Sequence, residues 1–201
     1  MRKEQAIVDW SYEGKPDFSS GTGATRAERT LALGSAFIVP AVVLAMWLTR
    51  DYGWSLLQLG VALALAFDVG GGLVSNALNS CKRFYHTPPK PSEGKLGAVL
   101  KHPVRFAAAH VHSVLVALLF EAERWATYGL FWYALLLLSV AVVLRTPLYL
   151  RRPVSFLAIL LATLANVYLV EPIAGFEWLA PLLFMKIVYG HLVREEPYRP
   201  A

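Results

Sequence analysis

The chain has 201 residues, of which 56% are hydrophobic and only 16% are charged. A soluble domain carries about 25% charged residues, so the composition argues against a soluble protein and favours an integral membrane protein. The formal net charge of +5 does not require a nucleic-acid partner, because Lys and Arg collect in the cytoplasmic loops of membrane proteins. The single cysteine excludes an internal disulfide and the usual multi-cysteine metal sites. We therefore expect an all-α, multi-pass protein of a cell (inner) membrane, with no nucleic-acid partner.

Residues 1–29 are mostly polar and lack the pattern of a cleaved signal peptide. We expect them to form a mostly irregular cytoplasmic arm, with apolar side chains such as Tyr12 lying on the membrane surface. Thr25 and Glu28 have the spacing of a capping box, in which each residue satisfies a backbone N–H of the other. The first helix is therefore predicted to begin at this point.

Six apolar segments follow, each close to the ~20 residues that a spanning helix needs. The second segment is unusually long and is interrupted by Gly70, Gly71 and Gly72, which would let either a substrate or another helix approach the backbone. Residues 30–194 are thus predicted to form a bundle of about six transmembrane helices, and residues 195–201 a cytoplasmic tail. The predicted spans are 31–49, 54–80, 103–120, 128–144, 153–170 and 178–193.

The distribution of basic residues predicts the orientation of this bundle. With six spans, the arm, the 81–102 loop, the 145–152 loop and the tail share one side and carry fifteen of the nineteen Lys and Arg residues. The loops on the other side carry only Arg50 and Arg124. Cytoplasmic loops are enriched in Lys and Arg, so both termini are predicted to lie in the cytoplasm.

Ionisable residues inside the apolar segments mark the predicted site, because such residues are costly in a membrane and usually functional. Asp68 lies in the second segment, twelve residues or about 18 Å before Ser80 at 1.5 Å per residue. His110 and His112 lie at a similar depth in the third segment, so Asp68 is expected to meet them across an antiparallel helix pair. Lys186 lies near the middle of the sixth segment, and Asp68 is its expected counter-ion.

These residues predict a polar cavity that opens to the cytoplasm between the second, third and sixth helices. His110 and His112 diverge by about 200° on a regular helix, so they cannot bind one metal ion there unless the helix is broken. Catalytic roles are assigned to Asp68, His110 and His112, and substrate contacts to Asn76, Asn79, Lys82, Arg83, Arg105, Lys186 and Tyr189. A divalent metal, zinc or iron, would be bound by members of the set Asp68, His86, His102, His110 and His112.

Two functions compete, and a third remains open. The first is a membrane-embedded enzyme, with or without a metal, that acts on a membrane lipid or another apolar or anionic small molecule from the cytoplasmic leaflet. The second is a small ion- or proton-coupled transporter or channel, possible as a homo-oligomer, with Asp68, His110 or His112, and Lys186 as its relay. The third is an assembly subunit whose polar groups only join helices. No phosphate loop, HExxH, GxSxG or histidine-box motif is present to select a reaction.

Overall fold

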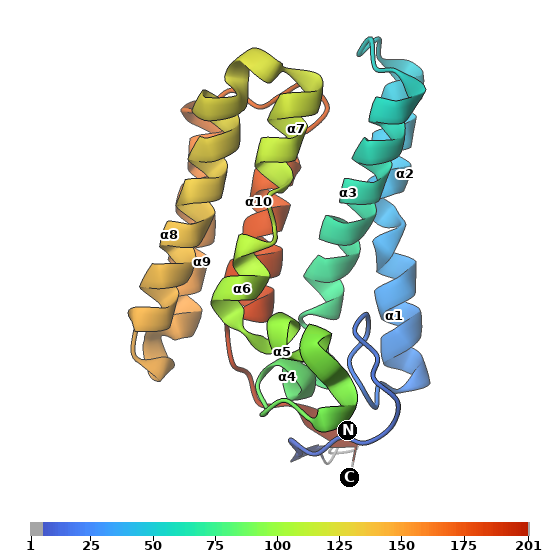
Figure 1. Ribbon diagram of the computed structural model, residues 1–201, viewed down its shortest axis with the longest axis vertical. Helices are drawn as coiled ribbons and strands as arrows, with labels where there is room; N and C mark the ends of the chain where they lie inside the picture. The colour runs from blue at the N-terminus through green and yellow to red at the C-terminus, as the bar shows by residue number, and fades with distance from the viewer. Residues whose placement is uncertain (1–5, 201) are drawn as a thin grey trace, which may run out of the picture.

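The computed structural model describes residues 6–200. Within this range the chain is mostly helical, and five helices are long and apolar enough to cross a membrane. These are Arg26–Thr49, Leu56–Ser75, Pro103–Phe120, Ala122–Arg145 and Leu148–Tyr168. A shorter apolar helix, Leu179–His191, corresponds to the sixth predicted segment. The prediction of a mostly helical chain with long apolar helices that could span a membrane is therefore confirmed (Figure 1).

The first long helix consists of α1 (Arg26–Ala36) and α2 (Ile38–Thr49), which meet at Phe37. Pro40 explains the change, because proline has no N–H to donate to the carbonyl four residues earlier and its ring clashes with that carbonyl. The chain then turns back into α3 (Leu56–Ser75), which packs along α1 and α2. Figure 1 shows these three helices as one layer of the molecule.

α3 continues through Gly70–Gly72 without a break, so the predicted interruption of this helix is wrong. The three glycines instead allow close packing. A Cβ atom on Gly70 would lie 2.7 Å from Val39 Cγ2, and one on Gly71 would lie 2.7 Å from Ala36 Cβ. A Cβ atom on Gly72 would overlap the side chain of Lys186. The glycine run therefore sets the distance of α3 from α1, α2 and the last helix.

The predicted second span is too long at its C-terminal end. α3 ends at Ser75, and after a turn the chain forms a separate short helix, α4 (Asn79–Tyr85). Asn79 and Arg83 therefore do not continue the helix face that carries Asp68. A 3-10 turn, η1 (Pro91–Glu93), and the helix α5 (Gly94–Lys101) complete the connection to the next long helix.

The third predicted span is not one regular helix. It consists of α6 (Pro103–Ala108) and α7 (His112–Phe120), with His110 and Val111 outside both. At the break, the N–H of His110 bonds to the carbonyl of Ala107 and that of Val111 to the carbonyl of Ala109, which tightens the chain. The break lies beside α3 and, as shown below, changes the direction of two histidines.

The remaining segments form the other side of the bundle and its centre. α8 and α9 lie side by side at one edge, and α10 with η5 lies between them and α3 (Figure 1). Large buried side chains such as Trp132 and Phe184, whose rings meet edge to face, fill the space between these helices. The elements are η2 (Ala122–Arg124), η3 (Trp125–Leu130), α8 (Phe131–Arg145), η4 (Leu148–Leu150), α9 (Arg151–Tyr168), α10 (Leu179–Phe184) and η5 (Met185–His191).

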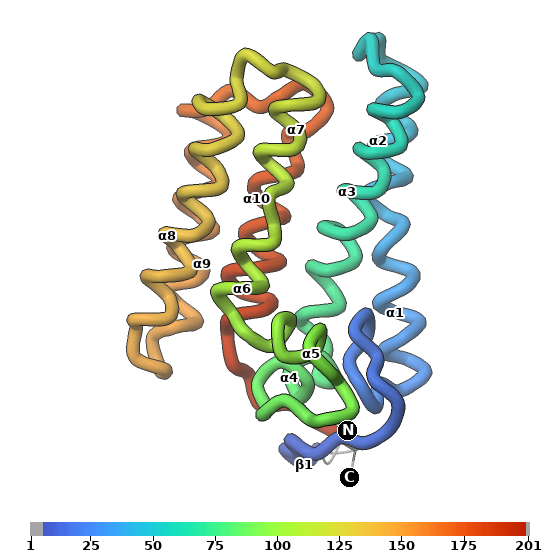
Figure 2. Tube along the Cα trace, viewed as in Figure 1, coloured from blue at the N-terminus to red at the C-terminus, as the bar shows by residue number. Residues whose placement is uncertain are grey.

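The two ends of the described chain meet at the base of the bundle, beside α4 and α5 (Figure 2). β1 (Ala6–Val8) pairs antiparallel with β2 (Tyr198–Pro200). The arm then packs against the base, where Ser20 is buried. The predicted capping box is confirmed: Thr25 Oγ1 accepts from the Glu28 N–H at 3.2 Å, and a Glu28 carboxylate oxygen accepts from the Thr25 N–H at 2.8 Å.

Candidate functional site

Asp68 lies at the centre of an ionic cluster. Its Oδ2 is 2.6 Å from Lys186 Nζ and 2.8 Å from His112 Nε2, so the predicted contacts with both residues are present. Gly72 makes room for Lys186, because any side chain there would occupy the path of the lysine. The Lys186 side chain is 4% exposed, whereas that of Asp68 is 50% exposed. Among residues 6–200, Asp68 Oδ1 has no hydrogen-bond partner, so the carboxylate keeps one open oxygen.

His110 and His112 lie together, which corrects the expectation for a regular helix. Because the helix breaks between them, their rings stack with centroids 5.1 Å apart and an interplanar angle of 12°. His110 Nδ1 is 2.6 Å from the carbonyl oxygen of Phe106. A carbonyl oxygen only accepts hydrogen bonds, so Nδ1 carries the proton and Nε2 keeps a lone pair. His110 is therefore held in the form that can accept a proton at Nε2.

A cavity of about 660 Å³ lies beside this cluster. Its walls come from the arm, α1, α3, α4, α5, α6 and the last helix, so the expected walls of second, third and sixth helices were incomplete. Most of the lining side chains are apolar or small, in contrast to the polar cavity that was predicted. Asp68, His110 and Lys186 line it, whereas His112 contacts Asp68 from outside the cavity.

The two asparagines of the predicted site have separated. Asn76 lines the cavity, but its polar atoms are already paired: Nδ2 donates to the carbonyl of Lys186 at 3.2 Å and Oδ1 accepts from the Tyr85 hydroxyl at 3.2 Å. Asn79 lies on α4, where its Oδ1 accepts from the N–H of Tyr198 at 3.1 Å. Asn76 thus shapes the cavity wall, and Asn79 holds the end of the chain at the base.

Lys82 and Arg83 are buried beneath the bundle and do not line the cavity. Lys82 Nζ donates to the carbonyls of Gly190 at 2.7 Å and Val193 at 2.8 Å, at the C-terminal end of the last helix. Burial lowers the pKa of Lys82 to about 8. Arg83 lies 3.8 Å from the Glu28 carboxylate. Lys82 therefore holds the C-terminal end of the last helix to α4, whereas Arg83 Nε and Nη1 are buried without a hydrogen-bond partner among residues 6–200.

The other predicted residues also lie away from Asp68. The Tyr189 hydroxyl donates to Glu195 at 2.6 Å, and Arg105 is exposed. His102 caps α6, accepting from the Arg105 N–H at 3.3 Å. Burial lowers the pKa of His86 to about 3, which keeps this imidazole neutral.

Among residues 6–200, no three His, Cys, Asp or Glu side chains are grouped closely enough to hold a metal ion. Asp68 contacts His112, and His112 stacks on His110, but the three side chains do not form such a group. His86 and His102 lie at the loop between α4 and α6. The zinc or iron ion expected from the sequence therefore stays a prediction.

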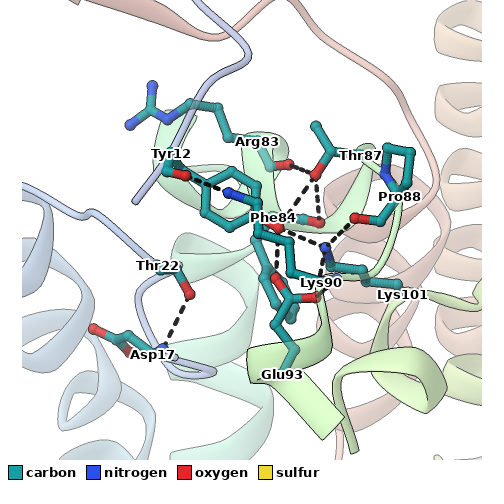
Figure 3. Close-up of polar contacts among 10 residues, drawn as sticks. All are labelled: Tyr12, Asp17, Thr22, Arg83, Phe84, Thr87, Pro88, Lys90, Glu93 and Lys101. Atoms are coloured by element: carbon teal, nitrogen blue, oxygen red, sulfur yellow. Dashed lines mark hydrogen bonds and ion pairs between the residues drawn. The ribbon is translucent and has the colours of Figure 1, made fainter. Parts of the chain in front are cut away.

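A second buried polar cluster was not predicted (Figure 3). The Tyr12 hydroxyl donates to Glu93 at 2.5 Å, and Lys101 Nζ lies 2.9 Å from the other Glu93 oxygen and 2.7 Å from the Tyr12 hydroxyl. Tyr12, expected on the membrane surface, is therefore buried. Burial alone would raise the pKa of Glu93, but the hydrogen bonds from Tyr12, Lys101 and the Lys90 N–H outweigh it and lower that pKa. The cluster fastens α5, one wall of the cavity, to the arm.

In comparisons with known proteins, no protein-family model, curated protein sequence or solved structure matches this chain.

Proposed function

We propose that the protein is a membrane-embedded enzyme that performs acid–base chemistry on a lipid-like molecule taken from the bilayer. The observation that carries the proposal is the cavity of about 660 Å³, whose mostly apolar walls lead to Asp68, Lys186 and His110. Small-molecule sites typically combine apolar walls with a few convergent polar groups, and this volume is typical of them. An apolar substrate would enter from the bilayer with no need for an aqueous path.

The polar groups suit proton transfer. His110 Nε2 has the lone pair of a general base. Lys186 places its ammonium next to Asp68 in the cavity wall, where it would stabilise negative charge that develops on a substrate, and His112 holds Asp68 from outside the cavity. Asp68 fixes the position of both side chains through one shared oxygen. Together, the cluster provides a proton acceptor and an electrostatic partner in a site of low polarity.

We further propose that six segments cross the membrane and that both termini are cytoplasmic. β1 pairs with β2, so the two ends of the described chain lie together, and this supports an even number of crossings. The charge distribution favours the cytoplasm for that side. The last helix, Leu179–His191, is only about 20 Å long at 1.5 Å per residue, shorter than the ~30 Å hydrocarbon core. This helix would therefore cross the membrane in the interior of the bundle, surrounded mainly by the other helices. The cavity would then face the cytoplasmic leaflet.

A proton-coupled transporter is the second candidate, because Asp68 is shared by two side chains that can carry protons, Lys186 and His112. Two observations count against it. Among the residues that the structure describes, those lining the cavity include none from the opposite end of the bundle, at 49–56 or 169–178. α3 is also unbroken, so it offers no free backbone groups at the glycine run.

The proposal is tested by profiling lipids. Purified protein in nanodiscs is incubated with a total lipid extract, and products are identified by liquid chromatography and mass spectrometry. We expect conversion of a subset of lipids, lost in His110→Gln and retained in His102→Asn, a control that keeps a helix-capping acceptor.

Conversion that survives in folded His110→Gln would refute the assigned base. No conversion, together with proton flux in liposomes that depends on Asp68, would support the transporter instead. Elemental analysis of the same protein tests for zinc or iron: bound metal that is lost in His110→Gln would replace the metal-free mechanism with a metal-dependent one.

A further inference from the structure

The cavity is long in the direction of the helices. Gly71 and Ala36 face each other, which fixes the register of the antiparallel helices α3 and α1. Arg29 lies seven residues before Ala36, and Asp68 lies three residues before Gly71. Because α1 and α3 are antiparallel, Arg29 lies on one side of the contact between Ala36 and Gly71 along the bundle axis and Asp68 lies on the other. The two separations therefore add, and Arg29 and Asp68 lie about 15 Å apart along the axis at 1.5 Å per residue. This is half of the ~30 Å hydrocarbon core, or the depth of one leaflet.

The end of the cavity near the base can receive an anion. Arg29 lines it with a side chain that is 59% exposed, and its Nε is 3.6 Å from an oxygen of Asp17. Asp17 is better satisfied by the N–H and hydroxyl groups of Ser19 and Ser20, at 2.6 to 3.1 Å. Among residues 6–200, Arg29 Nη1 and Nη2 have no hydrogen-bond partner, so they can bind a carboxylate or phosphate on the side of the guanidinium away from Asp17, whose charge would repel it.

The middle of the cavity fits a hydrocarbon chain. Leu33 and Ala36 of α1 line it between the two ends. Two of the polar side chains on this part of the wall, those of Asn76 and Tyr85, are hydrogen-bonded to each other at 3.2 Å, and Ser75 adds one hydroxyl. An apolar chain therefore leaves the hydrogen bond between Asn76 and Tyr85 intact when it occupies this part, whereas a polar chain would gain few hydrogen bonds.

The deep end fits a hydroxyl group. Asp68 Oδ1 and His110 Nε2 offer lone pairs, and the Lys186 ammonium has N–H groups beyond the one directed at Asp68. A hydroxyl both donates and accepts, so it matches this set. A carboxylate there would be repelled by Asp68, and an ammonium by Lys186. Neither charged group matches the site as a neutral hydroxyl does.

We propose that the substrate is a single-chain anionic amphiphile that carries a hydroxyl group about one leaflet's depth, roughly 15 Å, from its charged head. The head lies at Arg29, the chain follows α1 and α3, and the hydroxyl lies between Asp68 and His110. This assignment rests on the proposed function, because it names the substrate class of the same cavity.

The test measures binding and needs no turnover. Parinaric acid, a fluorescent fatty acid, is bound to the detergent-solubilised protein and detected by energy transfer from the tryptophans. It is then displaced by stearate and by hydroxystearates with the hydroxyl beside the carboxylate or at mid-chain. We expect the mid-chain isomer to displace the probe at about a threefold to tenfold lower concentration than the others, the effect of about one net hydrogen bond.

Variants assign the two ends. The wild-type protein should bind the free acid more tightly than its methyl ester. Arg29→Gln should abolish this preference but keep the preference for the mid-chain hydroxyl. Arg26→Gln, an exposed α1 arginine outside the cavity, should behave as wild type. His110→Phe should remove the hydroxyl preference and keep the acid preference.

Three results would overturn the inference: no saturable probe binding, equal displacement by all isomers, or strongest displacement by the isomer with the hydroxyl beside the carboxylate. The last would place the charged head at Asp68. If the mid-chain isomer displaces the probe best but no lipid is converted, the proposed ligand class stands and the proposed enzymatic function is refuted. If lipids are converted but the isomers rank differently, the enzymatic function stands and the ligand class is refuted.

Discussion

Removing the carboxylate of Asp68 should destabilise the protein more than removing the amine of Lys186. The Lys186 side chain is 4% exposed, so Asp68→Asn leaves an ammonium in the apolar interior without its anion. Removing one partner of a buried pair costs about 3–5 kcal/mol. In Lys186→Met, the remaining carboxylate is 50% exposed and keeps His112 at 2.8 Å. Because the carboxylate keeps this partner and still faces the cavity, we expect the loss to be the smaller of the two.

The measurement is a double-mutant cycle by reversible unfolding in detergent, followed by circular dichroism. Asp68→Asn combined with Lys186→Met should recover most of the stability lost in Asp68→Asn alone, because neither charge then remains, and the coupling energy should be about 2 kcal/mol. Asp51→Asn, in the exposed turn before α3, is the matched control and should stay near wild type. Equal losses in the two single variants, or additive losses in the double variant, would refute the asymmetric burial of the pair.

Three further outcomes follow from the packing and the base of the fold. Gly71→Ala should lower the free energy of unfolding by about 1–3 kcal/mol, because the new Cβ meets rigid backbone-bound atoms of α1. Gly72→Ala should cost at least as much, because the new Cβ occupies the path of Lys186 and displaces its buried ammonium from Asp68. Thermal denaturation of both compares them, and a clearly smaller loss for Gly72→Ala would contradict this. The folded pKa of Glu93 is lowered, so its stabilisation is complete above the unfolded value of about 4.3 and disappears as the pH falls through the folded value. Glu93→Gln should therefore lower stability at neutral pH and flatten its decline in acid; an unchanged acid decline would argue against the cluster. Cys81 is 1% exposed and burial raises the pKa of its thiol, so maleimide should label it only after denaturation, and rapid labelling of the native protein would show that the base opens.

The sequence predicted the features of this protein that have a local or strongly energetic cause. The capping box at Thr25 and Glu28 depends on residues three apart, so its form is visible in the chain itself. The contact between Asp68 and Lys186 was predictable because a charge in an apolar segment needs a partner, and few candidates exist at the same depth. Both arguments need no knowledge of how the helices are arranged.

Other features depend on packing that the sequence does not display. A glycine run permits either a broken helix or a close helix contact, and only the positions of Val39 and Ala36 decide for the contact. The break before His112 occurs at Ala109–Val111, which contains no proline or glycine to signal it. The cavity wall made by α5 depends on Tyr12 meeting Glu93, residues far apart in the chain.

The pairing of β1 with β2 makes the closure of the base depend on the whole bundle between them. β1 precedes α1 and β2 follows the last helix, so the two strands can pair only once the intervening helices have brought them together. The closure is reinforced by Arg199, which lies 2.7 Å from Asp9 and donates to the carbonyl of Ser11 at 2.6 Å. A bundle in which one helix is displaced would leave β1 unpaired. Exposed strand edges are sites of aberrant association, so the pairing also couples the correct packing of the helices to the protection of this edge.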